Sequence, residues 1–429
     1  MSKANKESFM DKNISRRKLL KSAGIGGVGM VIGASGLGGI LAAADSHSIS
    51  INKDDKDRIP FYGEHQAGIT TAMQSSVYLA SLDVVTDKKA ELIQLFKEWT
   101  EASAAMTTGR KVGDHSTNDL LPPADTGEAT GLSPSNLTIT FGVGPTLFIK
   151  DNVDRFGLLS KKPDELVDLP KFPLDALEDQ WTGGDLCIQA CSDDPQVTFH
   201  AIRNLLRIAR GKVTLRWAQE GFLPNRQANE QEKTPRNLFG FKDGTVNVNT
   251  NDTKESSEHL WVQQNDGPSW LTGGTYLVVR RIQMFIEVWD RTTLQDQENT
   301  FGRHRSSGAP LGKEDEFDKL DLDRKDENGK LQIPDTAHAS LAHGKGKEQI
   351  LRRSYSYSGG MDPKTGALDA GLLFMSFQRS PKKQFIPIQE RLAKKDELNE
   401  YISHKGSAVF ACLPGAKAGG FIGESLFTL

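Results

Sequence analysis

The sequence predicts an α+β protein made of two similar halves. Segments with strand-like and helix-like spacing of apolar residues alternate along the chain, and their order occurs twice. Each half reads β-α-β-β-α-β, the split β-α-β pattern of an antiparallel sheet covered by helices. A length of 429 residues, with 37% hydrophobic and 25% charged residues, suits two medium-sized soluble domains.

The first half contains six expected elements. A helix is predicted over residues 88–107, where Leu and aromatic residues recur with helical spacing. A second helix is predicted over residues 195–210, because Asp194 offers an N-cap, Pro195 occupies the first turn and Gly211 ends the helix. Strands are expected over residues 137–141, 185–191 and 213–222, and a further strand with its flanks over residues 69–85.

The second half repeats this order. Strands are expected over residues 275–288, 370–378 and 408–413, and helices from Asp290 and over residues 386–393. A charged segment, residues 302–330, is predicted to be a long surface insertion, and residues 225–232 form a second polar segment. Part of the insertion, residues 321–329, faintly resembles a calcium loop, but it lacks the acidic twelfth residue, so we expect a solvated loop. The expected domains are residues 58–236 and 237–429.

Charge and cysteine content exclude several classes of protein. A formal net charge of -3 gives no electrostatic basis for binding nucleic acid. Three cysteines are too few for a disulfide framework. Cys187 and Cys191 lie in an apolar segment with spacing that does not suit zinc, so we expect them to be buried.

The first 44 residues are predicted to be a signal peptide. A polar start leads to Arg16-Arg17-Lys18, followed by an uncharged stretch, residues 22–41, and the small-residue pattern Ala42-Ala43-Ala44. The paired arginines resemble a twin-arginine signal, although Leu19 stands where Phe is common. Residues 45–57 are expected to form a polar linker.

A retained membrane anchor is the alternative interpretation of this leader, since about 20 residues can span a bilayer. Eight glycines make the stretch weakly hydrophobic and a poor helix, which favours a cleaved leader. Both interpretations place the protein in the periplasm, outside the cell or at the cell surface. The twin-arginine translocase carries folded proteins, so the leader also favours a protein with a bound cofactor.

The segment Gly240-Phe241-Lys242-Asp243-Gly244 is the strongest chemical signal in the sequence. Glycines on both sides of Asp243 allow the backbone to approach a ligand closely. A partly desolvated carboxylate in such a turn is a candidate proton shuttle. An ordinary surface turn explains Asp-Gly equally well.

Two further segments favour the functional interpretation of Asp243 over an ordinary surface turn. His338 lies in an Asp-Thr-Ala-His segment, and Arg352 follows fourteen residues later in a strand-like run. Together with Gly240–Gly244, these residues match the GxxDG motif, the proximal histidine and the distal arginine of the dye-decolorizing peroxidases. The residues 61–68, 351–358 and 369–374, with the exported leader, resemble the EfeB-type deferrochelatase/peroxidase branch more narrowly. The resemblance runs from about residue 58 to the C-terminus.

The resemblance implies two ferredoxin-like domains, with one haem b held in the C-terminal domain. His338 would be the axial ligand of the iron. Asp335 is one candidate for the carboxylate that holds this histidine; a helix N-cap is its alternative role. Asp243 would move a proton of hydrogen peroxide and Arg352 would stabilise the developing negative charge. Phe374 would form a wall of the pocket, or serve as an ordinary core residue.

The expected contacts to the haem edge are less regular. Gly244, Thr245 and Val246 should lie against it. Ser340 stands where close relatives have Arg, and His343-Gly344-Lys345 replaces a more usual Asn-Pro-Arg, with Lys345 still able to pair with a propionate. Bulky donors would pass electrons through surface-accessible aromatic residues, for which the candidates are Trp261, Trp270, Trp289 and Tyr355.

Three functions stay open on this evidence. The first is a peroxidase that reduces hydrogen peroxide and oxidises an organic or metal-ion donor, within iron uptake. The second is a deferrochelatase that releases iron from haem and leaves the porphyrin intact. The third is a haem carrier, which has no use for Asp243 and Arg352 together. The expected partners are hydrogen peroxide, haem, iron-uptake membrane proteins, the twin-arginine translocase and further copies of the chain in a homo-oligomer.

Overall fold

The computed structural model describes residues 57–113, 118–224, 234–344, 346–363 and 365–428. The predicted leader, all of the linker except Asp57, the polar segment 225–232 and Lys345 lie outside these ranges. The described residues belong to one compact unit, residues 51–429. Among the helices of these residues, none has the length and apolarity that crossing a bilayer requires.

The first half forms the predicted four-stranded sheet. Its antiparallel strands lie in the order β4-β1-β3-β2. Helix α4 (Pro195–Ile208) begins as expected, because the Asp194 side chain accepts a hydrogen bond from the backbone of Gln196. The other elements are β1 (Ser76–Val84), α2 (Lys89–Met106), β2 (Thr138–Val143), α3 (Pro145–Phe148), β3 (Leu186–Ser192) and β4 (Val213–Phe222).

The second half repeats the arrangement, with the antiparallel order β9-β5-β8-β7. The two-residue strand β6 continues the β7 edge of β8. The ferredoxin-like fold predicted for each half is therefore confirmed. Its elements are α5 (Thr253–His259), β5 (Thr275–Met284), α6 (Ile286–Trp289), α7 (Leu294–Phe301), α8 (His338–His343), β6 (Leu351–Arg352), β7 (Tyr355–Met361), β8 (Leu368–Gln378), α9 (Phe385–Lys395), β9 (Ile402–Cys412) and α10 (Glu424–Thr428).

The predicted boundaries differ from the structure at several elements. The strand expected over residues 408–413 already begins at Ile402. The strand expected over residues 275–288 ends at Met284, and the short helix α6 follows. This turn buries Trp289 against Phe239 and Phe301, with ring centroids 4.5 and 5.7 Å from the tryptophan ring. The helix expected at Asp290 begins at Leu294, where the Thr293 side chain caps it. Burial of an aromatic side chain therefore overrides the local β-branched pattern.

The two sheets join at both edges into a closed ring of strands. Strand β2 pairs with β9 through Gly142 and Val143, and β4 pairs with β7 at Phe222 and Ser356. A side chain at Gly142 would begin 2.8 Å from the sulfur of Cys187, so only glycine fits this junction. This pairing provides hydrogen-bond partners for the backbone of edge strands that would otherwise be unpaired. The cluster inside the ring includes Leu79, Leu277, Phe377, Phe410 and all three cysteines, which are buried as expected.

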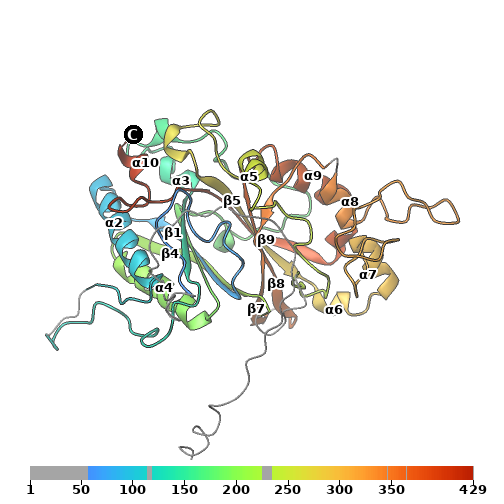
Figure 1. Cartoon of the computed structure of the whole chain (residues 1–429), viewed down its shortest axis with the longest axis horizontal. Coiled ribbons are helices and arrows are strands. Elements are labelled where there is room, and N and C mark those ends of the chain that lie inside the picture. Colours follow the sequence, from blue (N-terminus) through green and yellow to red (C-terminus); the bar gives the residue numbers. More distant parts are fainter. Residues whose placement is uncertain (1–56, 114–117, 225–233, 345, 364, 429) are drawn as a thin grey trace, which may run out of the picture. The chain divides into compact units, whose positions relative to one another are not determined.

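Helices cover the outer faces of the ring. Figure 1 shows α2 and α4 beside the first sheet and α7, α8 and α9 beside the second. The chain ends at α10, next to α2, where the rings of Phe96 and Phe427 lie 5.6 Å apart. The C-terminal residues thus pack on the first half, and the predicted boundary between residues 236 and 237 does not separate every contact of the two halves.

Candidate active site

A cavity of about 340 Å³ lies in the second half. It is bounded by the β5–β8–β9 face, by α8 and α9, and by the loop of residues 237–248. A mostly apolar cavity of this size with a few polar groups is typical of a site for a small molecule or cofactor. Much of its wall is apolar and consists of Ile282, Met284, Leu372, Phe374, Ile388 and Leu392.

His338 faces this cavity from the first turn of α8. Its Nδ1 lies 2.6 Å from Oδ2 of Asp396, whose side chain is only 2% exposed. An ionised carboxylate can only accept, so Nδ1 carries a proton, and in the neutral imidazole Nε2 is the nitrogen with the lone pair. No described residue forms a hydrogen bond with Nε2, while 31% of the His338 side chain stays accessible. This is the arrangement of a histidine prepared to bind a metal.

The electrostatics of His338 reflect both its burial and its partner. Burial lowers its pKa, but the charge and hydrogen bond of Asp396 outweigh burial and raise the pKa above its usual value. Asp243 raises and Arg352 lowers the same pKa, so both lie within electrostatic reach of the imidazole. The sequence candidate for the carboxylate partner, Asp335, is wrong: it lines a different pocket, and Ala337 is the N-cap of α8.

Two buried aromatic residues fix the loop that carries Asp243. Phe241 stacks on Phe301 with centroids 4.1 Å apart, and Phe239 packs on Trp289. The Asn237 side chain closes the loop by accepting hydrogen bonds from the backbone N–H groups of Phe239 and Phe241. The loop ends at Gly244, whose φ of +119° is a conformation that favours glycine over other residues. The alternating pattern Phe-Gly-Phe-Lys-Asp-Gly therefore buries two rings and leaves Asp243 at the cavity.

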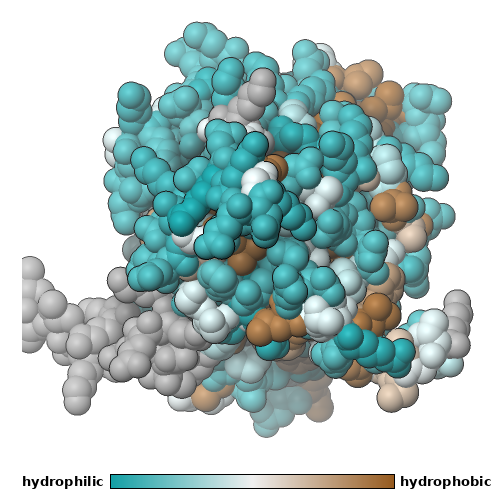
Figure 2. All heavy atoms as spheres, turned by 90° about the vertical axis from the view of Figure 1, so that its right-hand side faces the viewer, coloured by the Kyte–Doolittle hydropathy of each residue, from teal (hydrophilic) through white to brown (hydrophobic). Residues whose placement is uncertain are grey.

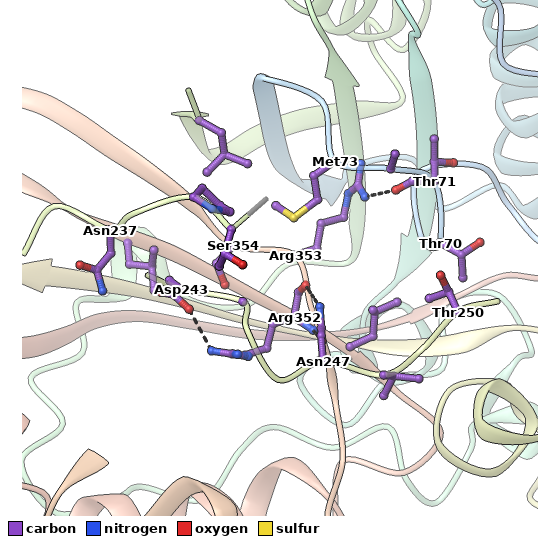
Figure 3. A pocket seen from close by; sticks show the side chains of 18 of the residues that line it. Thr70, Thr71, Met73, Asn237, Asp243, Asn247, Thr250, Arg352, Arg353 and Ser354 are labelled. Atoms are coloured by element: carbon purple, nitrogen blue, oxygen red, sulfur yellow. Dashed lines mark hydrogen bonds and ion pairs between the residues drawn. The ribbon is translucent and has the colours of Figure 1, made fainter. Parts of the chain in front are cut away.

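Asp243 and Arg352 form an ion pair at the cavity wall (Figure 3). The Arg352 Nη1 lies 2.9 Å from Oδ1 of Asp243, and Nη2 donates to the carbonyl of Val246. The Asn247 side chain holds the Arg352 backbone, accepting from its N–H at 2.7 Å and donating to its carbonyl at 2.9 Å. Two residues more than a hundred positions apart in the sequence thus form an ion pair. These hydrogen bonds hold the Arg352 guanidinium in one orientation.

Glu316 clamps the Asp243 loop from the predicted insertion. Its carboxylate accepts from Lys242 Nζ at 2.6 Å and from the Thr245 hydroxyl at 2.9 Å, on both sides of Asp243. Burial raises the pKa of Glu316, but hydrogen bonds from Lys242, Thr234 and Thr245 outweigh it and lower the pKa. The prediction of a surface insertion over residues 302–330 is therefore wrong at Glu316, which is 8% exposed.

Both halves of the chain match models of one protein family. The family model described as "Dyp-type peroxidase, C-terminal" matches residues 234–417, and that described as "Dyp-type peroxidase, N-terminal" matches residues 66–223. The chain belongs to the Dyp-type peroxidases. A deferrochelatase of Yersinia pseudotuberculosis is 40% identical over 425 residues, 96% of this chain and 94% of that protein. A deferrochelatase of Escherichia coli K12 is 38% identical over 426 residues, 96% of each protein.

Solved structures of Dyp-type peroxidases share the fold. Ferric DtpA from Streptomyces lividans has a TM-score of 0.80 and 34% identity, covering 86% of this chain and 97% of that chain. The enzyme from Cellulomonas bogoriensis has a TM-score of 0.78 and 38% identity, covering 87% and 98%. Dyp-type peroxidases depend on haem, and this chain is therefore a haem-dependent enzyme.

Most of the predicted ligand-binding residues of this Dyp-type peroxidase meet at the cavity. Besides Asp243, His338 and Arg352, the wall contains Gly244, Thr245, Val246, His343 and Phe374. Gly344, which follows α8 with a positive φ, is not among the residues that line the cavity. Lys345 lies outside the described residues, so its role stays a prediction.

A buried charged group that the sequence analysis missed also lines the cavity. Arg280 and His404 both line the wall and are buried, with the Arg280 Nε 3.1 Å from the His404 Nδ1. Burial and the Arg280 charge hold the pKa of His404 well below its usual value, so His404 is neutral. Arg280 pairs with Asp175 of the first half. The only signal for this group in the sequence was the alternation of inward and outward side chains along β5.

The four aromatic residues expected to be surface-accessible are buried instead. Tyr355 is 0% exposed, Trp270 and Trp289 are each 2% exposed and Trp261 is 8% exposed. The Trp289 and Trp270 indole N–H groups donate to the carbonyls of Phe239 and Lys161, so packing and hydrogen bonding account for their positions. The expected surface-accessible aromatic residue is therefore none of these four.

Proposed function

We propose that the cavity holds one haem b per chain, with His338 as the axial ligand. The observation that carries this proposal is the His338–Asp396 pair, which leaves Nε2 unpartnered among the described residues and facing an apolar cavity. The donor set fits haem, because imidazole supported by a carboxylate is a strong axial donor. When bound, haem supplies the redox-active iron that accepts the oxidising equivalents of peroxide.

The Asp243–Arg352 pair would act on hydrogen peroxide. Asp243 accepts a proton from one peroxide oxygen and returns it to the other oxygen as the O–O bond breaks. Arg352 keeps its proton and stabilises negative charge on the leaving oxygen with donors whose direction is fixed. Phe374 and Leu372 exclude water from the same wall. We infer that the principal activity is reduction of hydrogen peroxide with oxidation of an organic or metal-ion donor, within iron uptake.

Replacement of the proposed ligand tests this function. The variant His338→Ala should lose haem or bind it at least tenfold more weakly, because the axial bond is gone. The Soret band and the haem content after reconstitution measure this effect. The control is His304→Ala, since His304 pairs with Glu298, does not line the cavity and should keep the wild-type spectrum. A normal spectrum for His338→Ala would remove His338 as the ligand.

Release of iron from haem is a second candidate function. It is favoured by the deferrochelatase relatives, which are 38–40% identical over nearly the whole chain. In that reaction haem is the substrate, and the same cavity would hold it while iron leaves and intact porphyrin remains. Haem incubated with the purified protein, with and without hydrogen peroxide, separates the two functions. Free porphyrin formed without peroxide supports iron release, whereas donor oxidation that requires peroxide supports the peroxidase.

We further propose that the protein is exported by the twin-arginine translocase and works outside the cytoplasm. The support is the order of basic, uncharged and small residues in the first 44 positions. Iron-uptake membrane proteins would be its partners there, and the protein would form a homo-oligomer. Cleavage of the leader gives a free protein, and retention gives an anchored one. The mass of the mature N-terminus distinguishes these two forms.

A further inference from the structure

A loop of the first half carries two neighbouring leucines on its surface. The loop leads from α2 to β2, and Figure 1 shows it, in teal, extending away from the first half beside α4. Leu120 is 92% exposed and Leu121 is 58% exposed. The surface of the second half, seen in Figure 2, is by contrast mostly hydrophilic. We call residues 118–121 the leucine tip, and an exposed apolar element of this kind is typical of a contact surface.

Local contacts hold the leucine tip in its projecting position. The Asn118 carbonyl accepts a hydrogen bond from the Leu121 N–H at 3.0 Å, and the Asn118 side chain accepts one from the Leu120 N–H at 3.0 Å. Two prolines follow, and they restrict the backbone of the preceding residue to extended conformations. The second of them, Pro123, is fixed to α4, because its carbonyl accepts from Arg207 Nη1 at 2.6 Å. The tip is therefore ordered before any partner binds.

Buried charged groups tie the base of the same loop to α4. His200 is 5% exposed, and its ring nitrogens lie 3.0 Å from Oε2 of Glu128 and 3.6 Å from Oδ2 of Asp125. Burial raises the pKa of Glu128, but hydrogen bonds from Thr126, His200 and Arg203 outweigh it and lower the pKa to about 2. Glu128 is therefore ionised at neutral pH, and the anchor of the loop is kept.

An apolar groove of about 240 Å³ lies on α4 beside this anchor. Phe199, Ile202 and Leu206 line it, and Phe199 is 45% exposed although it lies within the helix. Arg207 also lines the groove, so the groove borders the residue that holds Pro123. The leucine tip of the same chain does not fill the groove, since its leucines are exposed.

The charges around the two surfaces are complementary. Asp119 lies on the leucine tip, and Arg210 lies at the rim of the groove. Both residues are exposed, and within the described ranges neither side chain forms a hydrogen bond or an ion pair. An acidic apolar tip thus matches a basic apolar groove, and opposite charges of this kind favour one orientation of binding.

We propose that the leucine tip of one copy binds in the α4 groove of a second copy, and that two-fold symmetry repeats this contact in a dimer. Two-fold symmetry fills both grooves with both tips and closes the assembly, whereas a head-to-tail contact would leave one tip and one groove open. The inference names the interface of the homo-oligomer proposed above and rests on that proposal. It does not depend on haem chemistry.

Sedimentation equilibrium of the haem-loaded protein tests this interface. The wild type should form dimers, and Leu120→Ser and Phe199→Ser should each raise the dimer Kd at least tenfold, because each removes apolar burial from both contacts. Both positions are exposed, so the variants should keep the wild-type circular dichroism. The matched control is Leu294→Ser in the second half, at a leucine that is 57% exposed and should not affect the dimer.

A mixture of the two variants gives a result that misfolding cannot produce. In a heterodimer, the intact tip of the Phe199→Ser chain meets the intact groove of the Leu120→Ser chain. The heterodimer should therefore have a Kd at least threefold lower than either variant homodimer. Absence of this rescue would overturn the tip-and-groove pairing.

The remaining outcomes separate the interface from the proposals on which it rests. A wild-type protein that stays monomeric would overturn both the homo-oligomer and this interface, and tip-dependent binding of that monomer to phosphatidylglycerol vesicles would assign the tip to a lipid surface instead. A wild-type dimer that Leu120→Ser and Phe199→Ser leave unchanged would overturn the interface alone. The Soret band of the same samples reports haem binding, so failure of the proposed haem site is seen separately.

Discussion

Asp396 accepts a hydrogen bond from His338 at 2.6 Å across 58 positions of sequence. The same carboxylate also accepts from the Leu398 backbone and thereby caps the short helix of residues Glu397–Glu400. One buried side chain therefore fixes both the start of this short helix and the imidazole of the proposed iron ligand.

Asp396→Asn should weaken haem binding by about 10- to 100-fold, as loss of such a partner does in other metal sites. Asparagine keeps an acceptor for the Leu398 N–H but removes the charge that makes the imidazole more basic. The iron should also become easier to reduce, so its reduction potential should rise. Haem transfer to an acceptor protein and a spectroscopic redox titration measure these effects. Asp335→Asn is the matched control and should behave as wild type; equal behaviour of both variants would refute the assignment.

Asp243→Asn should slow the peroxide step by roughly two to four orders of magnitude, because the amide cannot accept the proton. The single variant Arg352→Leu should slow the peroxide step more than Asp243→Asn does, because it removes the charge stabilisation. Stopped-flow measurement of the Soret change after mixing with peroxide gives both rates. Asp266→Asn removes an Asp–Arg pair of similar geometry with Arg379 and should have no effect. Wild-type rates in both test variants would disprove the proposed mechanism and favour iron release from haem.

Glu316→Gln should lower the free energy of unfolding at pH 7 by about 1–3 kcal/mol, since it leaves Lys242 without its charged partner. The pKa of Glu316 is lowered in the folded protein, so its stabilisation is present above the ordinary value of 4.5 and is lost as pH falls through the folded pKa. Urea unfolding of the wild type and the variant should therefore converge in acid. The exposed Glu314→Gln is the control; a difference that stays constant down to low pH would contradict the clamp.

Replacement of Arg16 and Arg17 together by Lys should trap the precursor in the cytoplasm, because the paired arginines are the feature that the translocase reads. Fractionation followed by immunoblotting locates the protein. A change of Lys18→Arg keeps the charge and the pair, and it should leave export intact. Export of the double variant at the wild-type level would mean that the leader uses another route.

The repeated order of elements was predictable because it depends on local spacing. The cap at Asp194 and the apolar period of α2 lie within a few residues of the structure they specify. The turn at Phe285–Trp289 was not predictable in this way, because β-branched residues favour a strand there and the contacts that stop it come from Phe239 and Phe301. The burial of Trp261 and Trp270 has the same origin in distant contacts.

Local spacing was enough to predict the two-half α+β pattern, and the matching motifs were enough to select His338, Asp243 and Arg352 as candidates. Only the tertiary structure decided which groups support them: Asp396 for His338, Asn247 for Arg352 and Glu316 for the loop of Asp243. Closure of the two sheets into one ring was equally beyond the sequence. The physical reason is that hydrogen bonds and ion pairs join side chains tens to hundreds of positions apart, which no local periodicity encodes.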